Sequence, residues 1–170
     1  MNYIKNIFYF ILVSLTLIAC SSDSEDEIDQ IPQFDRSAIL KNYADNIIIP
    51  RYNDLKSELD NLKTAVDNFT QTPNTTNFDK VHQKWLSTYI KWQHIEMFNI
   101  GKAEEIYYLN TINTYPVDEV RINENINSER YDLSNSNDWS CQGLSGIDYM
   151  LHGTGNNKEE VIQKYINNPK

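Results

Sequence analysis

Apolar side chains recur every three or four residues along most of the chain, which is the period of an α-helix. The first such stretch begins after Asp35, a residue type favoured at helix N-caps, and continues to about Pro73. One face of this stretch carries Leu40, Tyr43, Ile47, Leu55, Leu59, Leu62, Val66 and Phe69. An apolar face of this length needs a partner to cover it. Pro50 interrupts the pattern without changing its phase, so we expect a kink there rather than a helix end.

A second helix is predicted to open near Thr76 and to end before Gly101. Asp79 follows Thr76 by three residues, an approximate capping box. The apolar seam of this helix consists of Phe78, Val81, Trp85, Thr88 or Tyr89, Trp92 and Ile95. Because the loop around Pro73 is short, we expect the first two helices to be antiparallel neighbours.

Shorter helical segments follow. Residues 103–116 predict a third helix that breaks at Pro116, and residues 118–126 add another turn or two. Residues 125–139 are rich in Asn and Ser and have no period, which predicts an exposed loop.

Two more helices are predicted in the last part of the chain. The first covers residues 142–152, and its Ser145 and Asp148 point the same way because positions three apart share a helical face. The second begins at a capping box made by Asn157 and Glu160. The pattern as a whole predicts an all-α fold, a helical bundle.

The N-terminus has the pattern of an export signal. Lys5 precedes an apolar run that is too short for a comfortable membrane span, so residues 1–19 are predicted to be a lipoprotein signal peptide. The segment LIAC, ending at Cys20, resembles the lipobox of bacterial lipoproteins and predicts lipidation of that thiol. An ordinary cleaved signal followed by a chance cysteine is the alternative.

The segment behind Cys20 is polar and acidic, and we expect residues 20–34 to be a tether. In Bacteroidetes lipoproteins such a run resembles a signal for surface display, although acidic tethers also serve solubility. We therefore expect an outer-membrane lipoprotein that reaches the membrane through its lipid anchor, on the periplasmic face or the cell surface.

The charge of the chain favours cations as ligands. The chain carries 15 basic and 24 acidic residues, a net charge of −9, and loss of the signal peptide with Lys5 makes this −10. Such a chain repels nucleic acid, so we expect no nucleic-acid partner. If Cys20 is acylated, Cys141 is left alone, and we expect it to be a small buried residue.

Four fragments, NIIIPRYNDL, KWQHIEMFNIGKA, NTYPVDEV and GLSGIDYMLHG, resemble the imelysin-like lipoproteins in their order and spacing. The resemblance covers residues 39–153 and implies an all-helical envelope protein built from two four-helix bundles. Because members are longer, residues 35–170 resemble only the N-terminal half. We therefore expect an incomplete domain, marginally stable alone, with a missing C-terminal half or a partner chain.

The family's motif, a glycine, one residue, a histidine, two residues and a glutamate, aligns with Gly143, Ser145 and Asp148. An imidazole and a carboxylate so spaced can hold one metal ion. Here the histidine position is Ser145, whose hydroxyl is a poor ligand, while Asp148 keeps the charge. Glu96, four residues after Trp92, is expected on the flank of the buried seam, as a further ligand or as part of a salt bridge. The predicted metal residues are thus Glu96, Ser145 and Asp148, for iron or another divalent metal.

The three histidines are not expected to form a metal site. No two of His82, His94 and His152 have the spacing of a metalloprotease helix, so we expect each to be solvated. The leading prediction is an envelope binding protein associated with iron or metal acquisition, with an iron-uptake system as a partner. The alternatives are a metallopeptidase, against which Ser145 counts, and a non-catalytic surface scaffold or glycan-binding lipoprotein.

Overall fold

The computed structural model describes residues 34–168. The chain divides into two units, residues 1–36 and 37–170, and the account below concerns the second. The predicted signal peptide, Cys20 and nearly all of the tether lie outside the described residues. Residues 34–168 contain helices and no strand, which confirms the all-α prediction. Within this range no helix combines the length and the apolar character that a membrane span requires.

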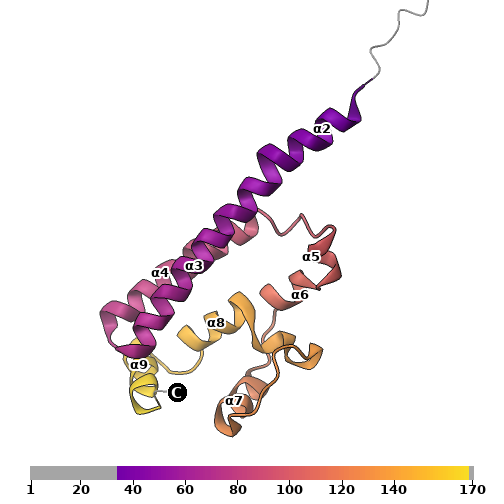
Figure 1. Cartoon of the computed structure of the whole chain (residues 1–170). Helices are drawn as coiled ribbons and strands as arrows, with labels where there is room; N and C mark the ends of the chain where they lie inside the picture. The colour runs from indigo at the N-terminus through magenta and orange to yellow at the C-terminus, as the bar shows by residue number, and fades with distance from the viewer. Residues whose placement is uncertain (1–33, 169–170) are drawn as a thin grey trace, which may run out of the picture. The chain divides into compact units, whose positions relative to one another are not determined.

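The first predicted helix is present and continues past Pro50 (Figure 1). It consists of α2 (Arg36–Tyr43), the π-helical segment η1 (Ala44–Ile48) and α3 (Ile49–Gln71) in direct succession. Proline lacks the N–H that would bond four residues back, and its ring crowds the carbonyl there. The wider π-helical turns immediately before Pro50 are a common way to absorb such an interruption.

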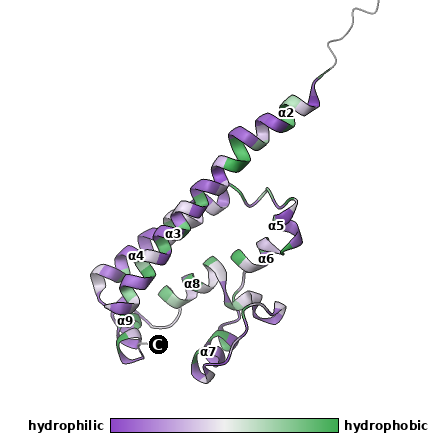
Figure 2. Cartoon of the chain, viewed as in Figure 1, coloured by the Kyte–Doolittle hydropathy of each residue, from purple (hydrophilic) through white to green (hydrophobic). Residues whose placement is uncertain are grey.

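The apolar face of this helix is covered only in its second part. Leu55 and Leu62 are buried, whereas Leu40 and Tyr43 are 70% and 49% exposed. Figure 2 shows green, hydrophobic positions along α2 as well as along α3. The described residues therefore supply a partner for α3 and leave the apolar side chains of α2 largely in solvent.

That partner is α4 (Thr75–Gln93), which runs antiparallel beside α3, as predicted (Figure 1). The N-cap is Asn74, whose side chain accepts a hydrogen bond from the Asn77 N–H, so the predicted box of Thr76 and Asp79 is not formed. The helix ends at Gln93 and is followed by turns. The core of buried side chains comprises Leu55, Leu62, Ala65, Phe69, Phe78, Val81, Trp92, Ile95, Leu144, Leu151, Val161 and Ile162.

The middle of the chain is more broken than predicted. The segment expected over residues 103–116 forms α5 (Lys102–Glu105) and α6 (Tyr108–Ile112), separated by the left-handed Tyr107. It ends ahead of Pro116, which follows a cis peptide bond. The next helix, α7 (Glu119–Ser128), is capped by the Asp118 side chain.

The segment predicted as an exposed loop is partly helical. It contains the 3₁₀-helix η2 (Ser136–Cys141), and Asp138 within it is only 3% exposed. The last two helices among the described residues are α8 (Gly143–His152) and α9 (Lys158–Asn167), both as predicted. The Asn157 side-chain oxygen accepts from the Glu160 N–H, and the Glu160 carboxylate accepts from the Asn157 side-chain NH₂ and from the Asn156 N–H, so the predicted capping box forms with the return bonds shifted to these donors.

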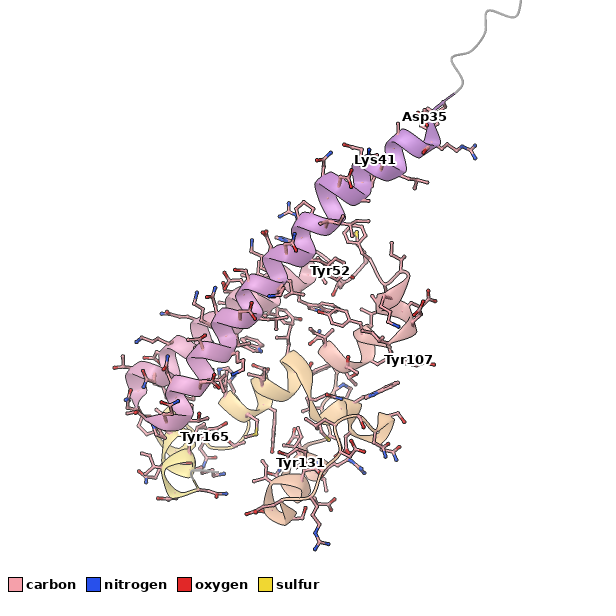
Figure 3. The ribbon with its side chains drawn as sticks, viewed as in Figure 1. Asp35, Lys41, Tyr52, Tyr107, Tyr131 and Tyr165 are labelled. Carbon is pink, nitrogen blue, oxygen red and sulfur yellow. The ribbon has the colours of Figure 1, made fainter. Side chains whose placement is uncertain are left out.

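Two tyrosines labelled in Figure 3 connect these elements. The hydroxyl of Tyr52 on α3 donates to the Phe98 carbonyl at 2.9 Å, and that of Tyr165 on α9 donates to the Met150 carbonyl at 3.3 Å. The first contact ties the segment after α4 to α3. The second ties α9 to α8, the helix that carries the predicted metal turn.

Candidate functional site

The start of α8 requires a glycine. Gly143 has φ +73°, and a Cβ atom there would lie 2.3 Å from the Ile112 carbonyl oxygen and 2.6 Å from that of Thr111. Both contacts are with backbone, which cannot rotate aside. Gly143 thus lets α8 begin directly against the end of α6, and the first turn of α8 is placed by this approach.

Two hydrogen bonds fix that first turn. The Ser145 hydroxyl donates to the Asn113 side-chain oxygen at 2.7 Å, beside the end of α6. The Trp85 indole N–H donates to the Leu144 carbonyl at 2.8 Å, across to α4. The Ser145 hydroxyl therefore has a structural partner of its own, and α8 is held between α6 and α4.

A cavity of about 510 Å³, here called the α8 cavity, opens beside this turn. Ser145 and Asp148 both line it, which places them on one face as predicted. Its other polar side chains include Asn113 and Glu119. The aromatic side chains in its lining are Trp85, Tyr89, Tyr115 and Tyr149. A cavity of about 530 Å³ lies elsewhere, against α7, and none of the predicted metal residues lines it.

Asp148 is hydrogen-bonded to His152, whose side chain is exposed to solvent as expected. The Nδ1 atom of His152 lies 2.9 Å from the Asp148 Oδ1 and 3.1 Å from the Asp148 carbonyl oxygen. The His82 ring, from α4, lies 5.1 Å from the His152 ring, at an interplanar angle of 78°. No sequence spacing could have indicated this pair, because its members come from helices some seventy residues apart.

Trp85 holds a central place beside these rings. Its ring centre lies 6.4 Å from that of His82, nearly parallel to it, and 6.2 Å from that of His152. On its other side Trp85 stacks on Tyr89, with ring centres 5.5 Å apart. One indole ring thus borders both histidines and the aromatic lining of the α8 cavity.

Glu96 lies apart from the other two predicted metal residues. It follows the end of α4, its side chain is exposed, and it does not line the α8 cavity. The expectation that it lies on the flank of the buried seam is wrong, and its exposed carboxylate pays no desolvation cost. The cavity does contain a second carboxylate beside Asp148, that of Glu119.

The fit of the turn to a metal ion is partial. The Ser145 hydroxyl donates its hydrogen bond to Asn113, and a neutral hydroxyl is a weak metal ligand. Asp148 keeps a carboxylate at the cavity, with one oxygen bonded to His152. In residues 34–168, no group of three or more His, Cys, Asp or Glu side chains is arranged to hold a metal ion.

The chain segment leading into α8 is held by an ion pair between the buried Asp138 and the partly exposed Arg121. The Arg121 Nε–H donates to the Asp138 Oδ1, and the Asn125 amide donates to the same oxygen at 3.4 Å. The Arg121 hydrogen bond holds the pKa of the Asp138 carboxyl below its ordinary value. Nearby Cys141 is half-buried, and burial raises the pKa of its thiol, which favours the predicted structural role.

Comparisons with known proteins agree with this helical fold and point to one family. The family model described as Imelysin matches residues 48–167. Iron-regulated protein A of Synechococcus elongatus is 23% identical over 79 residues, which cover 46% of this chain and 22% of that protein. The chain therefore spans less than a quarter of this curated relative. No solved structure matches the chain significantly.

Proposed function

The chain belongs to the imelysin family, and from that premise we propose that it is an envelope-anchored lipoprotein associated with iron or metal acquisition, which binds a divalent metal ion in the α8 cavity. The observation that carries this proposal is the meeting of Ser145 and Asp148 in one cavity with a second carboxylate, Glu119. The link to iron rests on the name of the matched relative, which records regulation by iron.

The oxygen atoms around the cavity set the class of ion. Asp148 and Glu119 supply carboxylates, and Asn113 and Ser145 supply neutral oxygens. Such ligands suit hard or intermediate divalent ions such as Mn²⁺ and Fe²⁺. The net charge of −9 adds a favourable long-range potential for a cation.

The anchoring part of the proposal rests on the sequence. A lipobox-like segment ends at Cys20, and an acidic tether separates it from the helical domain. Lipidation of Cys20 would hold the domain at the outer membrane, on its periplasmic face or at the cell surface, within reach of an iron-uptake system. A C-terminal half or partner chain would cover the exposed apolar side chains of α2, such as Leu40.

We propose binding rather than peptide hydrolysis. A metallopeptidase needs a metal held firmly enough to activate water, together with a general base. Ser145 replaces the histidine that the family motif would supply, and its proton is committed to Asn113. The metallopeptidase alternative would require a nitrogen ligand in place of that histidine, and the imidazole in the cavity lining, His152, directs its Nδ1 at Asp148.

The test is a thermal melt of the chain without its signal peptide, with and without micromolar Mn²⁺ or Fe²⁺. The midpoint should rise with metal in the wild type and in Glu96→Gln, which lies outside the cavity, but not in Asp148→Asn or Glu119→Gln. Ser145→His should bind more tightly, because it restores an imidazole to the turn. A metal response lost in Glu96→Gln and kept in Glu119→Gln would overturn the proposed ligand set.

The aromatic lining favours a second candidate, a surface lipoprotein that binds glycans. Trp85 and Tyr89 stack with ring centres 5.5 Å apart, and Tyr115 is 86% exposed at the cavity. Exposed aromatic faces of this kind can pack against the apolar faces of sugar rings. Saccharide binding that Tyr115→Ala abolishes, in a chain indifferent to every metal, would favour this candidate.

A further inference from the structure

Beyond the α8 cavity, we propose that His82 and His152 form a second metal site, which binds a transition-metal ion such as Ni²⁺, Cu²⁺ or Zn²⁺ through two imidazole nitrogens. The pair lies between α4 and α8, and His152 borders both the α8 cavity and a separate hollow that His82 also lines. It shares Asp148, which orients His152, with the proposed α8 site, but it uses neither Ser145 nor Glu119, so variants of Glu119 separate the two proposals.

The spacing of the two rings suits a shared ion. A metal ion lies about 2 Å from the imidazole nitrogen that binds it, hence about 3 Å from the ring centre. Two such arms that meet near the tetrahedral angle place their ring centres about 5 Å apart. The observed separation of the His82 and His152 ring centres is 5.1 Å.

The surroundings of His152 fix its tautomer. Its Nδ1 faces the Asp148 carboxylate oxygen at 2.9 Å and the Asp148 carbonyl oxygen at 3.1 Å. Both of these atoms can only accept, so Nδ1 carries the proton and donates it. In the neutral ring, Nε2 is therefore left with a free lone pair for a metal. Metal-binding histidines commonly have this arrangement, with a carboxylate that orients the ring from behind.

The His82 ring is held by stacking and remains open to a ligand. It lies nearly parallel to the Trp85 ring, at an interplanar angle of 19°. His82 and His152 both line a hollow of about 340 Å³, which gives an ion and its waters access. The charged groups beside this hollow are Asp79 and Lys158, and their 2.9 Å ion pair neutralises both.

The ligand set indicates the class of ion. Imidazole suits Zn²⁺, Cu²⁺ and Ni²⁺ better than Mg²⁺ or Ca²⁺. With two protein ligands, the other coordination positions are filled by water or by a group from outside the chain. The bound ion would then exchange readily with ions in solution, unlike the zinc ion of a structural site, which four protein ligands surround.

The experiment titrates the full chain with NiCl₂ and follows tryptophan fluorescence, with calorimetry for the affinity. Ni²⁺ bound between the histidines lies close to Trp85 and should quench it. His82→Gln and His152→Gln should each weaken Ni²⁺ binding by about tenfold or more. His94→Gln is the matched control, because His94 is exposed beyond the end of α4 and its loss should change nothing.

Three results would overturn the proposal: Ni²⁺ binding unchanged in both His82→Gln and His152→Gln, equal losses in all three histidine variants, or no Ni²⁺ binding by the wild type. Glu119→Gln separates this site from the α8 cavity. It should abolish the Mn²⁺ response and leave Ni²⁺ quenching intact, so each proposal can fail without the other.

Discussion

Replacing Gly143 with alanine tests how α8 is held against the end of α6. Two costs add at this position. A non-glycine residue in a left-handed conformation destabilises the folded state by about 1–2 kcal/mol. The new Cβ would also lie 2.3 Å from the Ile112 oxygen, more than 1 Å short of the roughly 3.5 Å of an unstrained contact.

The second cost is that of overpacking. Because the opposing atoms belong to the backbone, α6 and α8 must move apart, which typically costs about 1–3 kcal/mol. Gly143→Ala should therefore lower the free energy of unfolding by about 2–5 kcal/mol in total. Gly101 provides the control, since it has φ +58° and no atom lies within 4 Å of its Cβ position. Gly101→Ala should lose only the conformational part of the free energy of unfolding, about 1–3 kcal/mol, because its ψ of −125° lies in a region that non-glycine residues rarely adopt.

The assay is urea unfolding followed by circular dichroism at 222 nm for the wild type and both variants. Both glycines have positive φ, so a larger loss of unfolding free energy in Gly143→Ala than in Gly101→Ala reports the contact with α6. Equal losses in Gly143→Ala and Gly101→Ala would refute the reasoning that the approach of Gly143 to Ile112 positions the turn.

Three further predictions concern stability. Asp138→Asn should lower the melting temperature at pH 7. The difference from the wild type should shrink as the pH falls through the lowered pKa of Asp138, because the hydrogen bond from Arg121 stabilises only the carboxylate. Thermal melts from pH 3 to 7 measure this difference, and a constant difference would contradict the prediction. Burial raises the pKa of Tyr165 to about 12, so stability should fall as the pH rises from about 10 to 12, where the unfolded-state phenol ionises first. Tyr165→Phe should flatten that fall in melts above pH 9, and identical slopes would exclude it. Leu55→Ala should cost about 2–5 kcal/mol by urea unfolding because Leu55 is 1% exposed, whereas Leu86→Ala, at 46% exposure, should cost far less.

The long helices could be predicted because their periodicity is local. The α3 stripe and the α4 seam occupy the core, and the box at Asn157 and Glu160 forms as expected. The end of α4 could not be located so well. Ile95 continues the seam and is buried although the helix has already ended at Gln93, so the pattern overran and misplaced Glu96. Local periodicity contains no signal for such an early end.

The site was predicted only in its local part. That Ser145 and Asp148 share a face follows from helical spacing, and the structure places them in one cavity. The approach of His82 to His152 depends on how α8 docks against α4, which no short-range pattern encodes. The burial of Asp138 was missed for the same reason, since the Arg121 that pairs with it comes from another helix.

The contact between α4 and the last two helices also bears on how the protein folds. The pair of α3 and α4 is joined by a short loop, so it can form early from contacts close in sequence. The Trp85 to Leu144 and Lys158 to Asp79 contacts close much longer stretches of chain and must form later. One histidine is thus carried by an early-folding hairpin and the other by a helix that docks late. Local opening of α8 would separate the two rings while the hairpin of α3 and α4 stays folded. An ion shared between the two histidines would therefore stabilise the docked position of α8, the last step of folding.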